Sequence, residues 1–83
     1  MTRDQFIEWA ESRGWKLDRY GHLKKSTGGK TYRFKLSRVA VRYEYRIKTH
    51  SSYGPTSRWV RIKSGYFSKL SVTPEGKLAG MRR

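Results

Sequence analysis

The residues of this chain that could do chemistry are cations placed at alternate positions. In residues 31–48 (TYRFKLSRVAVRYEYRIK), arginine and lysine alternate with aromatic and aliphatic residues, and residues 58–63 (RWVRIK) repeat the pattern. A period of two puts every second side chain on the same face of a β-strand. Guanidinium and ammonium groups gathered on one face would bind phosphates. The candidate binding residues are Arg33, Lys35, Arg42, Arg46, Lys48, Arg61 and Lys63.

The charge pattern of these two segments favours a role in binding. Like charges side by side on a sheet repel one another and lower stability. A face that only kept the protein in solution would mix both signs, and Glu44 is the only acidic residue in 31–48 and 58–63. We therefore interpret this surface as an anion-binding sheet face.

Alternation also places one tryptophan, Trp59, among these cations. Aromatic residues interleaved with arginine stack on unpaired bases. The pattern predicts that Trp59, Arg61 and Lys63 share a face, opposite Val60 and Ile62. A register shift of one residue would instead turn Trp59 toward the core.

Groups suited to catalysis are sparse. The two histidines, His22 and His50, lie in different segments, and only His22 could meet an acid, Asp18, across a turn as a general base. The sequence has no cysteine, which excludes disulfides and thiolate sites. We expect no metal site and no cofactor, and the sequence favours a binding protein over an enzyme without deciding between them.

Residues 8–36 combine a helix, the spacing Gly14-Trp15-x-Leu17-x-Arg19, then Gly21-His22 and a basic hairpin. This arrangement resembles the small HicA-type messenger-RNA-cleaving toxins, which have a double-stranded-RNA-binding-like fold. The resemblance covers about a third of the chain, and residues 38–48 indicate a strand where that family would place a helix. A small toxin-like RNase that needs His22 is therefore kept as an alternative.

Overall charge points to an anionic partner. The 83 residues, expected to form a single small basic domain over 1–83, carry a formal net charge of +14. Residues 1–18 hold a net −1 and residues 19–83 a net +15. Such basicity indicates nucleic acid first, and then anionic lipid or an acidic protein. No apolar run approaches the ~18 residues of a membrane span, no signal peptide is recognisable, and we expect a cytoplasmic location.

One helix is predicted, over residues 2–14. Thr2 and Gln5 have the spacing of a capping box, Phe6, Ile7 and Ala10 form an apolar stripe, and Gly14 suits the C′ position. We expect this helix to support the fold by covering the apolar face of the sheet.

The remaining pattern predicts short strands and turns. We expect hairpins at 15–26 and 70–80, a turn at 26–30, two strands or one bent strand at 31–48, a loop at 49–57 and a strand at 58–63. The predicted fold is α+β, with the helix packed on a twisted antiparallel sheet of four to six strands. A small open barrel of SH3-like or Sm-like type with an N-terminal helix is the alternative.

The function that these features favour is non-catalytic binding of nucleic acid. RNA or single-stranded DNA is favoured over duplex DNA, because aromatics are mixed with the cations and no basic helix is present for the major groove. An adaptor that docks on an acidic protein or assembly is the second hypothesis, and the RNase is the third.

Overall fold

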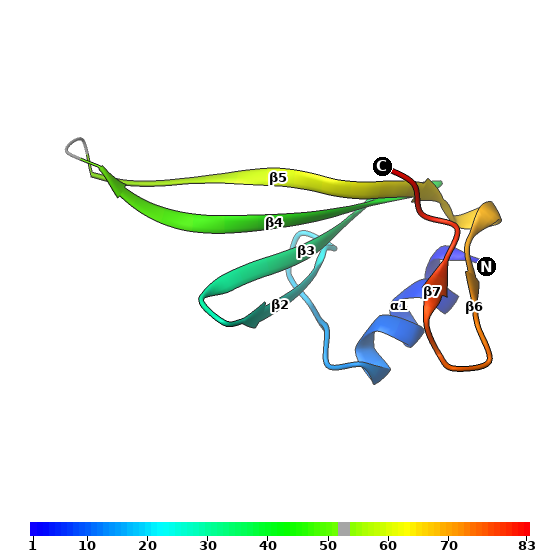
Figure 1. Ribbon diagram of the computed structural model, residues 1–83. Helices are drawn as coiled ribbons and strands as arrows, with labels where there is room; N and C mark the ends of the chain where they lie inside the picture. The colour runs from blue at the N-terminus through cyan, green and yellow to red at the C-terminus, as the bar shows by residue number, and fades with distance from the viewer. Residues whose placement is uncertain (52–53) are drawn as a thin grey trace.

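The fold is α+β, with one N-terminal helix packed against an open antiparallel sheet (Figure 1). The structure is a computed structural model that describes the backbone of residues 1–51 and 54–83 and the side chains of residues 1–46 and 58–83. Its elements are α1 (Arg3–Ser12), β1 (Lys16–Leu17), β2 (Leu23–Thr27), β3 (Lys30–Leu36), β4 (Ala40–Ser51), β5 (Gly54–Tyr66), the 3₁₀-helix η1 (Phe67–Lys69), β6 (Ser71–Val72) and β7 (Leu78–Ala79).

The first five strands form one sheet in the order β1-β2-β3-β4-β5, and β6 pairs with β7 in a second, two-stranded sheet. All the pairs are antiparallel. Within the described residues β1 and β5 are the two edges of the larger sheet. The predicted helix-on-sheet fold is confirmed, and the sheet does not close into the alternative barrel.

Helix α1 begins and ends at the predicted signals. The side chain of Thr2 accepts a hydrogen bond from the backbone of Gln5, and the Gln5 side chain accepts one from the backbone of Thr2. At the other end, Gly14 has a φ of 92°, and the amides of Gly14 and Trp15 donate to the carbonyls of Glu11 and Ala10. This pairing is a Schellman motif, which stops the helix.

The predicted hairpins at both ends of the chain are present. Between β2 and β3, the two-residue turn Gly28-Gly29 has positive φ at both positions, as a type I′ turn requires. In the outer hairpins, the side chains of Asp18 and Thr73 accept hydrogen bonds from the amide four residues later. The two hairpins are therefore closed by the same kind of side-chain hydrogen bond.

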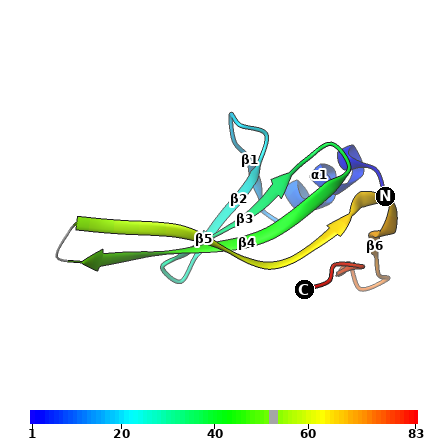
Figure 2. The same cartoon turned by 90° about the horizontal axis from the view of Figure 1, so that it is seen from above.

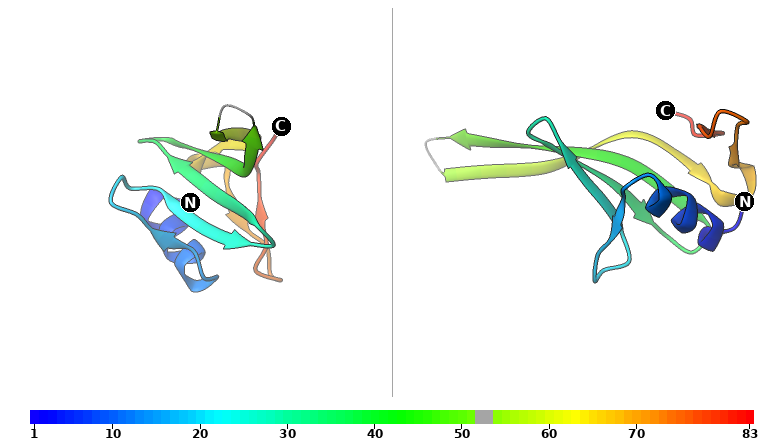
Figure 3. Two further views of the ribbon diagram at one scale, coloured as in Figure 1. Left: turned by 90° about the vertical axis from the view of Figure 1, so that its left-hand side faces the viewer. Right: turned by 90° about the horizontal axis from the view of Figure 1, so that it is seen from below.

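The core lies between α1 and one face of the sheet (Figure 3). Pairing sets Phe34 opposite Leu23 and Tyr43, and Leu36 opposite Val41, so these apolar side chains share a face. The Phe34 ring packs edge-on against Phe6 of α1, with ring centroids 4.9 Å apart. The buried residues of this core are Phe6, Ala10, Leu23, Phe34, Leu36, Val41, Phe67 and Leu70.

Alternation within 31–48 failed at one point. Residues 38 and 39 form the turn between β3 and β4, where the side chain of Ser37 bonds to the backbone of Ala40. The apolar residues of 31–48, Phe34 and Val39 among them, are predicted by the sequence pattern to share one face, but Val39 lies in this turn and is 58% exposed. The turn interrupts the pairing of β3 with β4, so Val39 stays exposed although its side chain is hydrophobic.

The predicted loop at 49–57 is wrong for the part that the structure describes. Strand β4 continues to Ser51 and β5 begins at Gly54, so the two strands form a long ribbon that extends beyond the rest of the sheet (Figure 2). A two-stranded ribbon has no third layer to cover it, so its sequence needs no apolar period. Pro55 is tolerated because β5 is an edge strand.

Among the residues that the structure describes, the one α-helix is too short and too polar to cross a bilayer.

Substitution of Phe34 by alanine should lower the free energy of unfolding by about 3–5 kcal/mol, because the ring fills the contact between α1 and the sheet. Val39→Ala is the matched control, since sequence alternation placed both residues on one face. Denaturant unfolding of both variants checks this, and equal losses would contradict the assignment of the core.

Candidate nucleic-acid interface

The side of the sheet away from α1 carries most of the predicted cations. Lys35 lies opposite Arg42 and Arg33 opposite Glu44 in the β3–β4 pair. In the β4–β5 pair, Trp59 lies opposite Arg46 and Arg61 opposite Glu44. Directly opposed residues of antiparallel strands share a face. We call this surface the basic face, and its members are Arg33, Lys35, Arg42, Glu44, Arg46, Trp59 and Arg61.

A β-bulge in β5 removes one predicted member from the basic face. Tyr43 pairs with Lys63 but the next residue, Glu44, pairs with Arg61, which leaves Ile62 as the extra residue. The bulge inverts the alternation, so Lys63 lies on the side of Tyr43 and not on the side of Arg61. The predicted grouping of Lys63 with Trp59 and Arg61 is therefore wrong.

The structure places the remaining predicted residues in two groups. Arg33, Arg46 and Trp59 form a packed cluster, while Lys35, Arg42 and Arg61 lie exposed nearer to the C-terminal tail. The backbone of Lys48 lies in β4, opposite Ser57. Its side chain is outside the described residues.

The single acid of the basic face neutralises one arginine. The Nε and Nη2 atoms of Arg33 donate to the same Glu44 oxygen, at 3.1 and 2.6 Å. Glu44 is only 5% exposed, and it is the one buried charged residue found among the described side chains. Because the pair is withdrawn from water, each charge depends on the other.

The Trp59 ring is in contact with the two arginines of this cluster. The guanidinium carbon of Arg33 lies 3.9 Å from the ring centroid, and that of Arg46 lies 4.8 Å from it. These are cation–π contacts, and the ring is half-buried. A base stacking on Trp59 would have to share or displace a guanidinium, so the predicted stacking role stays a prediction.

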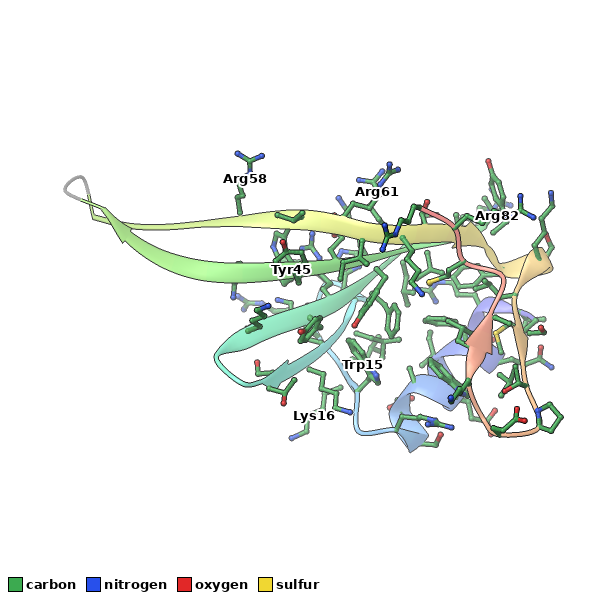
Figure 4. All side chains as sticks on the ribbon, in the orientation of Figure 1. Trp15, Lys16, Tyr45, Arg58, Arg61 and Arg82 are labelled. Atoms are coloured by element: carbon green, nitrogen blue, oxygen red, sulfur yellow. The ribbon has the colours of Figure 1, made fainter. Side chains whose placement is uncertain are left out.

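The three exposed cations line a cleft with the C-terminal tail. A cavity of about 500 Å³ lies between the basic face, the β3–β4 turn and residues 80–83. In Figure 4, Arg61 projects from β5 on the side away from β2, β3 and α1. We call this cavity the basic cleft; its lining contains six cations and no acidic side chain: Lys35, Arg42, Arg61, Lys69, Arg82 and Arg83.

Backbone contacts hold the tail in place as the second wall of the cleft. Ser64 and Arg82 exchange two backbone hydrogen bonds of 2.8 Å each, which adds a short bridge to the edge of β5. Gly80 has a φ of 106°, and a Cβ atom there would lie 2.3 Å from the Lys69 carbonyl oxygen. Only glycine fits at position 80, where the tail passes the backbone of Lys69, without a shift of the backbone.

Sequence reasoning missed several cleft residues: Tyr66, Lys69, Arg82 and Arg83. In the sequence, Arg82 and Arg83 form only a short basic tail. The bridge between Ser64 and Arg82 joins residues far apart in the chain, so no local sequence pattern predicts it. Simple alternation would set Tyr66 with Val60 and Ile62. Only the bulge turns Tyr66 to the basic face, where it pairs with Ala40.

His22 has a structural role in the hairpin. Its Nδ1 atom accepts a hydrogen bond of 3.2 Å from the amide of Leu36, and its own amide donates to Asp18. Burial lowers the pKa of His22 below 6.5; Asp18 opposes this shift, while Arg33, Lys35 and Lys24 strengthen it. A neutral imidazole that accepts from the backbone fits this environment. The side chains that the structure describes hold no group of three residues suited to bind a metal ion.

The lowered pKa of His22 predicts a pH dependence of stability. The unfolded chain binds a proton at His22 near pH 6.5, whereas the folded chain resists it, so stability should fall as pH drops below 6.5 toward the folded pKa. In His22→Asn, the asparagine side chain keeps an acceptor near the Leu36 amide but has no group that binds a proton in this pH range. Urea midpoints between pH 7.5 and 5 should therefore fall for the natural protein and flatten for the variant. A variant that falls equally would rule out His22 as the cause.

The Arg33–Glu44 pair predicts strongly non-additive substitutions. Glu44→Ala leaves the arginine buried without its partner and should cost about 3–5 kcal/mol of stability. The double variant Arg33→Met with Glu44→Leu should recover most of that loss, because no unpaired charge remains. Chemical denaturation measures both, with Glu75→Ala on the surface as a control. Equal losses of unfolding free energy in the single and double variants would show that the unpaired charge of Arg33 is not the cause of the loss.

Comparisons of the chain with protein-family models, curated proteins and solved structures gave no match. The strand β4 lies where a HicA-type toxin would have a helix, as the sequence indicated. The function of this chain must therefore be argued from its own geometry.

Proposed function

We propose that the protein binds nucleic acid without catalysing a reaction, and that RNA or single-stranded DNA is its ligand. The observation that carries this proposal is the run of exposed cations from the basic face into the basic cleft. In the described part of the chain, none of these cleft cations forms an ion pair; the two pairs present are Arg33–Glu44 and Lys24–Asp18. Phosphates would supply the missing negative charge.

The residues of the basic face have different tasks in this proposal. Arg42 and Arg61 hold phosphates directly, and Lys35 adds charge beside them. Arg33 and Arg46 are oriented by Trp59, so they present fixed guanidinium planes near the same surface. Lys48 adds charge along β4, and Lys63 contributes only to the overall field because it lies on the other side of the bulged strand.

The position of the helix supports a preference for unpaired strands. Helix α1 carries the exposed acids Asp4, Glu8 and Glu11 and lies on the opposite side of the sheet from the basic face. It therefore cannot serve as a basic recognition helix in a major groove. A sheet face with aromatic and arginine side chains suits splayed single strands.

The other hypotheses make different predictions. An adaptor for an acidic protein would use the same cations but show no general affinity for nucleic acid. An RNase would cleave the RNA that it binds, and cleavage would stop in His22→Ala. The expected cytoplasmic location also stays a prediction.

Affinity for a single-stranded oligonucleotide should fall steeply with salt. With about 4–6 phosphate contacts, the slope of log K against log salt should be roughly −3 to −4. Fluorescence anisotropy over a range of salt concentrations measures the slope, and gel analysis of the same RNA shows whether it stays intact. The matched variants are Arg61→Ala, which should reduce the slope by about 0.7, and Lys16→Ala on β1, which should not. A flat salt response would favour the acidic-protein adaptor, and shortened RNA would favour the RNase.

A further inference from the structure

We infer that the basic cleft holds one unpaired nucleotide of the bound strand, with its base on the ring of Tyr66 and its phosphate between β4 and the C-terminal tail. This inference rests on the proposed function and adds the residue that reads the base. It reassigns base stacking from Trp59 of the basic face to Tyr66, the last residue of β5.

Tyr66 is the aromatic residue best placed to receive a base. Its backbone pairs with Ala40, two residues from Arg42 along β4, and the residue lines the basic cleft. The residue is 58% exposed, and among the described side chains it has no aromatic or cation–π partner. The Trp59 ring, by contrast, is half-buried against Arg33. An exposed ring without a partner can stack on a base at no cost to existing contacts.

Cations on two sides of the cleft can hold the phosphate. Lys35 and Arg42 lie side by side on β3 and β4 and form one side. Arg82 comes from the opposite wall, and its backbone is fixed to Ser64 of β5. Guanidinium groups bind phosphate oxygens through paired hydrogen bonds. The base and the phosphate of one nucleotide would thus contact residues that are far apart in the sequence.

The shape of the cleft favours an unpaired nucleotide. Its volume of about 500 Å³ lies within the ~300–1,000 Å³ range of pockets that enclose small ligands. A base inside a duplex is stacked on both sides and must be flipped out before it can reach a ring in a pocket. A base in a single strand or loop reaches Tyr66 without that cost.

The test compares two single strands with the same number of phosphates: an oligouridylate, and a strand of the same length in which every nucleotide is abasic. Removal of the bases should weaken binding by the natural protein, and Tyr66→Ala should weaken binding to the intact strand by about 5- to 150-fold. The variant should no longer distinguish the two strands. Tyr66→Phe should behave as the natural protein, because it keeps the ring.

Two control variants separate the base from the charge. Arg42→Ala should weaken binding to both strands and reduce the salt slope, while leaving the preference for the intact strand. Tyr20→Ala removes a tyrosine that is 69% exposed but lies outside the cleft. This variant should leave the affinity for the intact strand and the affinity for the abasic strand unchanged. Thermal melts of each variant show that it is folded.

The outcomes distinguish failure of this inference from failure of the proposed function. No salt-dependent binding of either strand by the natural protein would overturn both. Normal binding that is equally strong in Tyr66→Ala, with the base preference retained, would overturn the cleft assignment alone. Loss of the preference in Trp59→Ala but not in Tyr66→Ala would return base stacking to the tryptophan.

Discussion

The contact of Phe34 with the rings on either side of it is the interaction on which the rest of the structure depends. Phe6 of α1 lies 4.9 Å from Phe34 between ring centroids, and Trp15, just after the helix, lies 4.2 Å from it. Once this face of β3 is buried, the neighbours Arg33 and Lys35 must point to the other side. The aromatic contact therefore decides which side of the sheet is basic.

The same constraint explains how so small a protein tolerates its charge. The core, formed by residues of α1, the sheet and η1, lies entirely on one side of the sheet, so the cations can stay in water on the other. Arg33 is drawn into a partly buried site, and Glu44 is the acid that balances it there. The cations of the cleft are left to repel one another at the surface, and a bound anion would relieve that repulsion.

Much of the fold could be predicted because its signals are local. The capping box of Thr2 and Gln5, the stop at Gly14 and the paired hairpins depend on neighbours within a few residues. The strand residues 49–51 and 54–57 were missed because this part of the sequence carries no apolar period. Lys63 was misplaced because a bulge changes the alternation, and neither Tyr43 nor Ile62 marks its position in the sequence. The cleft was missed because it depends on the bridge between Ser64 and Arg82, which only the folded chain brings together.

In the proposed function, the basic face and the basic cleft form the ligand-binding surface, and α1 only supports them. The most direct measurement is an NMR titration of the isotope-labelled protein with a short single-stranded RNA at low salt. We expect the amide resonances of Arg42, Arg61, Tyr66 and Arg82 to shift together as the RNA is added, and those of residues 3–12 to stay in place. Shifts concentrated in α1, with the cleft resonances unchanged, would contradict this expectation.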